Sequence, residues 1–230
     1  MTQSRKKGPL LICFAGIDGS GKTLQSKMLV EWMNGRGMRT DYVWNIFHPW
    51  LLGLPMKAAR RLFLRRADMF RDYDHYHRTR YDAFQKTGLA TCFHYCFLME
   101  YMLRFCPRLR WPLSRGHSVV CDRYVFDAVI GLAANLHYSD DRTRDTIDRI
   151  LRLMPTPDLV FLIDLPEDTA FHRKSDIPSL SYLAERRRMY LRLAEDYRMI
   201  ILDGSRPAAE IQDMARDAVA GCFSDRRQAG

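Results

Sequence analysis

The sequence lacks an apolar run long enough to cross a bilayer. Its longest runs, Leu10–Ala15 and Leu159–Ile163, fall far short of the roughly 20 residues that a membrane-spanning helix needs. It also lacks a C-x-x-C pair among its 6 cysteines, which argues against a redox pair or a zinc site. Cys92 and Cys96 flank His94, so a metal site there stays open beside the simpler interpretation, one face of a helix. We therefore expect a reduced, cytoplasmic protein with no membrane partner.

No internal repeat, low-complexity block or linker divides the 230 residues. We therefore expect one domain, residues 9–222, with a flexible N-terminus at residues 1–8 and a polar tail at residues 223–230.

The net charge of +9 is compatible with solubility alone, an anionic small molecule, nucleic acid or a membrane surface. The basic residues concentrate in the middle of the chain, where arginines alternate with aromatic residues between Met56 and Tyr81. That mixture can bind nucleic acid. However, Leu62, Met69 and Phe70 recur as a buried helical face requires. We predict a helical segment that serves the acceptor or a dimer, and no nucleic-acid partner.

Five short apolar segments alternate with helical patterns, which is typical of βαβ units and a parallel sheet. The predicted strands are Leu10–Ala15, Thr40–Ile46, His117–Tyr124, Pro157–Leu165 and Arg198–Gly204.

Two helical predictions are more specific. A helix over Thr23–Asn34 is expected to bury Leu24, Met28, Leu29 and Trp32. Pro107 and Pro112 are expected to help divide residues 51–115 into about three helices.

A glycine-rich turn follows the first strand and opens the first helix. Its residues are Gly16, Ile17, Asp18, Gly19, Ser20, Gly21, Lys22 and Thr23, which match G-x-x-x-x-G-K-[ST]. Glycines leave backbone N–H groups accessible to a polyphosphate, and the helix N-terminus adds further donors. Lys22 can reach the β- and γ-phosphates, and the Thr23 hydroxyl can bind Mg²⁺. The turn, which we call the phosphate cradle, predicts a nucleotide site. No N-K-x-D or D-x-x-G motif follows it, so ATP is favoured over GTP.

Several segments, in this order and spacing, resemble the thymidylate kinase group of P-loop nucleoside monophosphate kinases. The matching stretches are Phe14–Thr23, Gly116–Tyr124, Pro157–Lys174, Glu185–Tyr197 and Ile200–Ile211. The resemblance implies an α/β P-loop NTPase fold: a five-stranded parallel sheet flanked by helices, with a helical lid and, here, an enlarged helical middle segment. It also implies ATP and Mg²⁺ as cofactors, a nucleoside monophosphate or another small-molecule acceptor, and a homodimer.

The resemblance also implies roles for individual residues. Asp122 would organise Mg²⁺ together with Thr23, and Arg123 would hold the acceptor's phosphate. Asp18 would contact the acceptor's sugar hydroxyl, or else serve only as a turn residue. The lid, about residues 173–188, would neutralise transition-state charge through Arg173 and Arg187, a division typical of the bacterial branch. We interpret Arg186, Arg188 and Arg192 as a solvated helical face.

Two departures concern the acceptor side. An Arg-Glu-Pro-Gly turn is usual in this family after the second strand, whereas this chain has Val43–Trp50 there. The arginine of a family Ala-Asp-Arg stretch falls near Glu100, with Arg104 one turn further on. We expect transfer of phosphate from ATP to dTMP as the first hypothesis. The alternatives are a different small-molecule acceptor, or an ATP-binding protein without catalytic activity.

Overall fold

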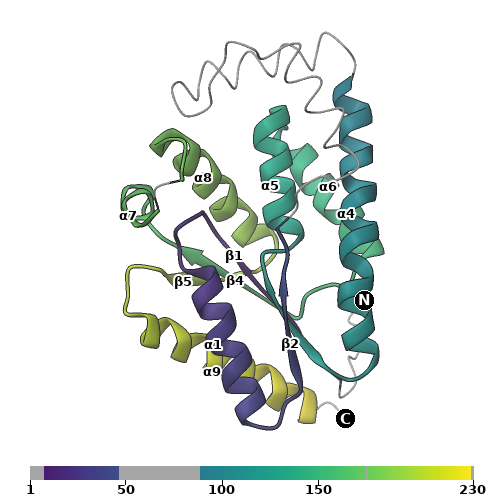
Figure 1. Cartoon of the computed structure of the whole chain (residues 1–230), viewed down its shortest axis with the longest axis vertical. Coiled ribbons are helices and arrows are strands. Elements are labelled where there is room, and N and C mark those ends of the chain that lie inside the picture. Colours follow the sequence, from purple (N-terminus) through teal and green to yellow (C-terminus); the bar gives the residue numbers. More distant parts are fainter. Residues whose placement is uncertain (1–7, 47–88, 175, 229–230) are drawn as a thin grey trace.

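The computed structural model describes residues 8–46, 89–174 and 176–228 (Figure 1). Within them, five parallel strands form one sheet in the order β2-β3-β1-β4-β5. The strands are β1 (Leu11–Ala15), β2 (Thr40–Trp44), β3 (Ser118–Asp122), β4 (Leu159–Asp164) and β5 (Ile200–Asp203). Each strand lies within one of the predicted segments. The prediction of an α/β fold with a parallel five-stranded sheet is therefore confirmed.

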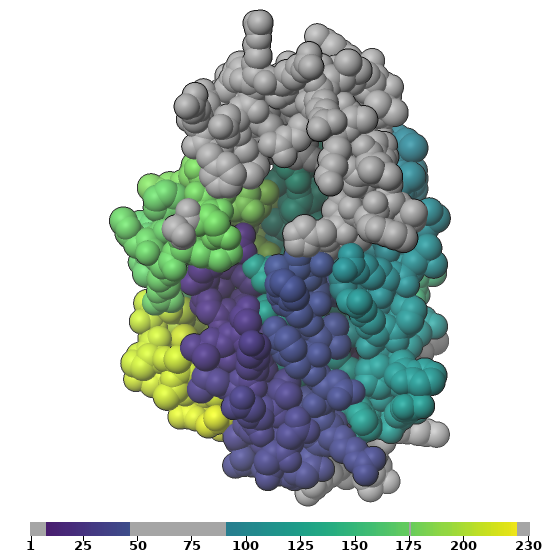
Figure 2. Space-filling view, in the orientation of Figure 1, coloured from purple at the N-terminus to yellow at the C-terminus, as the bar shows by residue number. Residues whose placement is uncertain are grey.

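Helices cover both faces of this sheet. The described helices are α1 (Lys22–Gly35), α4 (Leu89–Ser114), α5 (Val125–Leu136), α6 (Asp140–Leu153), α7 (Glu167–Arg173), α8 (Leu180–Asp196) and α9 (Ala208–Gln228). The helices α1 and α9 pack on one face, and α4, α5, α6 and α8 pack on the other. Figure 2 shows α1 in purple beside α9 in yellow. The helix α7 lies against the glycine-rich turn before α1, where the carbonyl oxygen of Ala170 faces Gly19.

The central strand β1 explains why the first apolar run does not alternate. Ile12 and Phe14 pack with Leu29 of α1, whereas Leu11 and Cys13 face the helices of the opposite layer. All of these side chains are buried. A strand between two helical layers has two apolar faces, so the run is continuous.

The buried face of α1 differs from the prediction. Leu24 is 52% exposed, while Gln25, Ser26, Leu29 and Met33 are buried. The cradle constrains the N-terminal end of α1, which begins directly after Gly21. Burial of Leu29 and Met33 in the core constrains the rest of the helix. Polar residues near the cradle are therefore buried at the expense of Leu24.

The helix α4 continues through both Pro107 and Pro112, so the prediction that these prolines divide the segment is wrong. Its apolar stripe runs across the first proline, because Tyr101, Phe105 and Leu109 are all fully buried. Burial of this stripe offsets the backbone hydrogen bonds that the prolines remove. The basic segment Met56–Tyr81 lies outside the described residues.

At the C-terminus, α9 extends to Gln228, so the predicted tail begins within a helix. Phe223 packs against the core and explains the continuation. Residues 1–7 of the predicted flexible N-terminus are outside the described part of the chain. In that part, no helix has the length and apolar character needed to cross a membrane.

Candidate active site

The phosphate cradle lies directly beyond the carboxyl end of β1, where close packing requires glycine at two positions. A Cβ at Gly16, whose φ is 140°, would lie 2.6 Å from the carbonyl oxygen of Ile163 in β4. A Cβ at Gly19, whose φ is 85°, would lie 2.6 Å from the carbonyl oxygen of Ala170 in α7. The turn is therefore held between two neighbouring elements in a conformation that only glycine adopts without strain.

Lys22 lies within the cradle itself. Its Nζ donates hydrogen bonds of 2.6 Å to the carbonyl oxygens of both Gly16 and Ile17, and it lies 3.5 Å from Oγ of Ser20. The side chain is buried. Burial, together with the nearby charge of Arg123, lowers the pKa of Lys22 to about 8. The predicted phosphate-binding cation is thus at the centre of the turn, with its proton held less tightly than in water.

Asp122 ends β3 next to the cradle and is fully buried. Its Oδ2 accepts hydrogen bonds from Oγ1 of Thr23 at 2.5 Å and from the hydroxyl of Tyr42 at 3.0 Å. Its Oδ1 lies 3.6 Å from Arg123 and has no hydrogen-bond partner among the described residues. Mg²⁺ takes oxygen ligands, and in P-loop enzymes a hydroxyl of the loop and an aspartate hold it, so Thr23 and Asp122 fit the predicted ion.

Arg123 adopts a left-handed backbone conformation with a φ of 71°, which is costly for a residue with a Cβ. Its guanidinium forms an ion pair with Asp18 of the cradle. Burial lowers the pKa of Arg123, but Asp127, Asp18 and Asp122 outweigh this effect, and the net pKa is raised. The strained turn thus fixes a permanent cation between the cradle and the space beside it.

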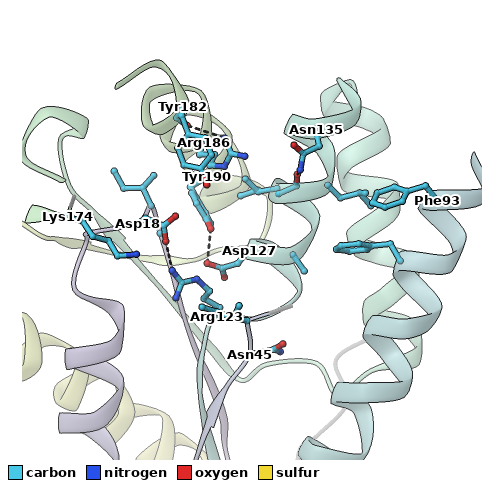
Figure 3. Close-up of a pocket in the computed structure, with 18 residues that line it drawn as sticks. Asp18, Asn45, Phe93, Arg123, Asp127, Asn135, Lys174, Tyr182, Arg186 and Tyr190 are labelled. Atoms are coloured by element: carbon cyan, nitrogen blue, oxygen red, sulfur yellow. Dashed lines mark hydrogen bonds and ion pairs between the residues drawn. The ribbon is translucent and has the colours of Figure 1, made fainter. Parts of the chain in front are cut away.

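A cavity of about 460 Å³ opens next to Arg123, within the range of about 300–1,000 Å³ typical of small-molecule sites. Figure 3 shows Asp18, Arg123 and Asp127 in its centre, Phe93 to one side, and Arg186 and Tyr182 across from the sheet. Its walls come from the cradle, from residues 45 and 46 after β2, and from α4, α5, α8 and Lys174. It is therefore assembled from segments distant in the sequence.

Asp127 links the cavity to α8. Its Oδ2 accepts a hydrogen bond from the backbone N–H of Tyr124 at 3.1 Å, and its Oδ1 accepts one from the Tyr190 hydroxyl at 2.7 Å. Burial raises the pKa of Asp127, although Lys22 and Arg123 oppose this shift. The carboxyl group therefore joins the N-terminus of α5 to the lid helix.

One face of α8 points into the cavity through Tyr182, Arg186 and Tyr190. Arg186 is only 9% exposed. Its guanidinium lies 3.6 Å from the centre of the Tyr182 ring and donates to the Tyr182 carbonyl oxygen at 3.2 Å. The interpretation of Arg186 as solvated is therefore wrong. In the sequence, the spacing of these three residues, one helical turn apart, was the pattern that indicated a shared face of the helix.

The two predicted lid arginines lie outside this cavity. Arg187 contacts both carboxylate oxygens of Asp164, at 2.7 and 3.0 Å, and Oε2 of Glu167 at 2.9 Å. Arg173 is exposed, with Nη1 3.5 Å from the carbonyl oxygen of Gly204. Both follow β4 as predicted, but Arg187 is engaged by two carboxylates at the end of that strand.

Neither Glu100 nor Arg104 lines the cavity. Glu100 is buried on α4, and Arg104 is exposed beside the ring of Phe105. The possible metal site on α4 is not supported either. His94 pairs with the Tyr138 hydroxyl at 2.6 Å, and no group of three potential metal ligands occurs among the described residues.

Three features define a P-loop phosphotransferase: a phosphate cradle with its lysine, a buried aspartate bonded to the cradle's threonine, and an adjoining cavity at the carboxyl ends of parallel strands. Comparison with known proteins gives the family. The thymidylate kinase family model matches residues 67–215, well over half of the chain. The chain belongs to the thymidylate kinase family and is a phosphotransferase.

Individual relatives cover most of the chain. A protein of Pyrococcus abyssi, described as a probable thymidylate kinase, is 25% identical over 216 residues, covering 91% of this chain and 93% of its own length. A probable thymidylate kinase of Methanocaldococcus jannaschii is 27% identical, with coverage of 87% and 90%. The thymidylate kinase of Caenorhabditis elegans is 28% identical, with coverage of 75% and 70%.

Proposed function

We propose that this protein transfers the γ-phosphoryl group of ATP to the phosphate of a nucleoside monophosphate, with dTMP as the preferred acceptor. The observation that carries this proposal is the position of Arg123 and Asp122. Asp122 is hydrogen-bonded to Thr23 of the cradle, and the adjacent Arg123 lines the cavity of about 460 Å³. A donor and an acceptor phosphate would have to meet at this pair. The kinship with thymidylate kinases supports dTMP.

On the donor side, the cradle N–H groups and Lys22 would hold the β- and γ-phosphates. Lys22 would exchange the carbonyl oxygens of Gly16 and Ile17 for phosphate oxygens. Thr23 and Asp122 would hold Mg²⁺, which supplies charge neutralisation between the phosphates when bound. The hydrogen bond between these two residues supports their common role.

On the acceptor side, Arg123 would bind the acceptor's phosphate in place of Asp18. Phe93 and Phe97 offer an aromatic wall for a base. Arg173 and Arg187 would neutralise charge on the transferred group when the lid closes. For this, Arg187 would have to leave Asp164 and Glu167, so closure would cost the free energy of those ion pairs.

A different acceptor is the second candidate, because the segment after β2 departs from the family pattern. Asn45 and Ile46 stand there instead of an Arg-Glu-Pro-Gly turn, and both line the cavity. The donor side would be unchanged in this case.

We also propose that the protein is a cytoplasmic homodimer. The scattered cysteines favour the location. An apolar stripe on α4 supports the dimer, because Tyr95, Met99 and Leu103 are 50–66% exposed and lie one helical turn apart. Analytical ultracentrifugation measures the mass directly. A monomer at micromolar concentration would contradict the dimer.

The function is tested by ADP release from Mg-ATP with a panel of nucleoside monophosphates, nucleosides and sugars. We expect dTMP-dependent turnover that falls on the order of 10²–10³-fold in Lys22→Ala, since a preorganised cation at the transferred phosphate is lost. Turnover with another acceptor alone supports the second candidate. A folded chain that binds ATP but turns over no acceptor would be a catalytically silent ATP-binding protein.

A further inference from the structure

Two cysteines lie side by side on the outer face of α4. Cys92 is exposed, Cys96 is half-buried, and both carry free thiols. They are one helical turn apart, and their Sγ atoms are 3.9 Å from each other. The sequence has no C-x-x-C pair, but a C-x-x-x-C spacing on a helix also brings two thiols to one face. The fold thus forms an accessible dithiol without the usual redox motif.

A metal ion does not account for this pair. His94, which stands between the two cysteines in the sequence, is buried and bonded to the Tyr138 hydroxyl. No group of three potential metal ligands occurs in residues 8–46, 89–174 and 176–228, whereas a structural zinc site needs four. The other chemistry open to two adjacent thiols is oxidation to a disulfide. In reducing compartments such a bond is usually transient, and either catalytic or redox-sensing.

The cysteine pair adjoins the wall of the acceptor cavity. Cys92 directly precedes Phe93, and Cys96 directly precedes Phe97. Both phenylalanines are buried and line the cavity, with their ring centres 6.2 Å apart. Two successive turns of α4 therefore each carry a thiol on the outer face and a cavity-lining ring on the inner face. A change in the backbone of these turns moves the aromatic wall.

A disulfide between the two cysteines changes that backbone. Helix geometry places the Cα atoms of residues i and i+4 about 6.2 Å apart, within the range of about 4.4–6.8 Å that a disulfide spans. The Cβ atoms are about 5–6 Å apart in a regular helix but about 3.8 Å apart across a disulfide. The bond is therefore within reach, but it distorts the turn. Cys92 lies in the first turn of α4, which begins at Leu89, and helix ends yield most readily.

We propose that Cys92 and Cys96 are a reversible oxidation site, at which a low-molecular-weight disulfide such as oxidised glutathione converts the two thiols to an intrahelical disulfide and displaces the aromatic wall. The formation of this disulfide goes beyond the proposed function, whereas its effect on the acceptor rests on it.

The reaction consists of two thiol–disulfide exchanges. The thiolate of the exposed Cys92 attacks one sulfur of oxidised glutathione and releases one glutathione thiolate. The thiolate of Cys96 then attacks the Cys92 sulfur of the mixed disulfide and releases the second. The two glutathione thiolates take up the two protons that the cysteines lose, so two protein thiols are oxidised and one glutathione disulfide is reduced. The hydrogen bond with Cys92 raises the pKa of the Cys96 thiol, which is consistent with Cys96 reacting second.

Mass spectrometry tests whether the disulfide forms. The reduced, full-length protein is incubated with oxidised glutathione, alkylated and digested. We expect a Cys92–Cys96 disulfide within one chain in the wild type and in Cys222→Ser, a control on the opposite face of the sheet. In Cys96→Ser the mixed disulfide of Cys92 with glutathione should accumulate, because the resolving thiol is missing. A pair that stays reduced in the wild type, or that links two chains instead, overturns the inference.

Two further measurements test the effect on the cavity. Hydrogen exchange of the amides in residues 89–98 should rise about threefold or more in the oxidised wild type and return with dithiothreitol. With dTMP as acceptor, oxidation should raise the acceptor's KM about threefold to tenfold and leave ATP affinity unchanged, and Cys92→Ser should not respond. A disulfide that changes neither quantity overturns the link to the cavity. A reduced enzyme that turns over no acceptor removes the proposed function, and hydrogen exchange then decides the inference.

Discussion

The phosphate cradle and the acceptor cavity differ in how the chain builds them. The cradle is one continuous turn, Gly16–Thr23, whose lysine is bound by the turn's own carbonyl oxygens. The cavity takes its walls from the cradle, the end of β2, α4, α5 and α8. Its charged groups include Asp18, Arg123, Asp127 and Arg186, which come from three separate stretches of the sequence.

This difference separates what is general in the site from what is particular. Any P-loop enzyme has to hold a triphosphate, and a short turn is sufficient for that purpose. An acceptor is recognised by its shape and by the positions of its donors and acceptors, which no single segment can surround. The two regions meet at Arg123, whose strained backbone places one guanidinium at their border.

The largest effect is expected from a substitution of Arg123. Arg123→Gln keeps the backbone strain but removes the charge, so kcat/KM for the acceptor should fall on the order of 10²–10³-fold. ATP affinity, measured by calorimetry, should change by less than about threefold. A comparable loss of ATP affinity would assign Arg123 to the donor region and contradict its role in binding the acceptor.

Neighbouring arginines of α8 test whether the acceptor cavity and the lid have separate roles. Arg186 faces the cavity, so Arg186→Gln should raise the KM for the acceptor about tenfold or more with little change in kcat. Arg187 pairs with Asp164 and Glu167, so Arg187→Gln should mainly lower kcat by removing charge supplied on lid closure. Arg188 is exposed, and Arg188→Gln is the matched control with both constants unchanged. Identical effects of the first two changes would contradict separate roles.

The pKa of Lys22 predicts a pH dependence confined to the cradle. Phosphates bind the protonated lysine, so ATP affinity should fall as the pH rises through about 8. Because the unfolded lysine titrates near 10.5, the unfolded chain holds more protons between these values. The free energy of unfolding of the wild type should therefore rise with pH in this window, relative to Lys22→Met, by about 1–3 kcal/mol. Denaturant unfolding at pH 7.5 and 10 measures the change, and parallel curves for the two proteins would argue against the shift.

The smallest effect concerns Gly131, a helical residue of α5 that lines the cavity and has no atom within 4 Å of an added Cβ. Gly131→Ala should stabilise the helix by about 0.5–1 kcal/mol and raise the KM for the acceptor a few-fold, since the methyl group enters the cavity. Gly221 in α9 has the same open surroundings but is not part of the cavity wall. Gly221→Ala should give the stability gain alone, measured by thermal unfolding. If both variants leave the acceptor's KM unchanged, this wall does not contact the acceptor.

The sheet and the cradle could be predicted because their signals are local. An apolar run that ends in glycines indicates both β1 and the turn after it. Asp122, the last residue of β3, and Arg123 after it lie at the same edge of the sheet. Pro107 misled the prediction, because the burial of Tyr101 and Phe105 that maintains α4 depends on the tertiary structure.

The cavity could be predicted only in part. Arg186 is one of three consecutive arginines, so composition alone did not distinguish it from its exposed neighbours. Only its helical spacing from Tyr182 and Tyr190 indicated a buried face. The position of Asn45 in the cavity wall could not be predicted, because its side chain is held by the hydroxyl of Tyr101, 56 residues away in the sequence. Side chains brought together by different elements acquire their roles only when the sheet order is known.

The most direct test is isothermal titration of the purified, folded chain with ATP, with and without Mg²⁺. We predict one ATP per chain, weaker binding when Mg²⁺ is chelated, and a loss of at least tenfold in affinity in Lys22→Ala. A folded wild-type chain that gives no heat of binding with Mg-ATP would contradict the assignment of Gly16–Thr23 as the phosphate cradle.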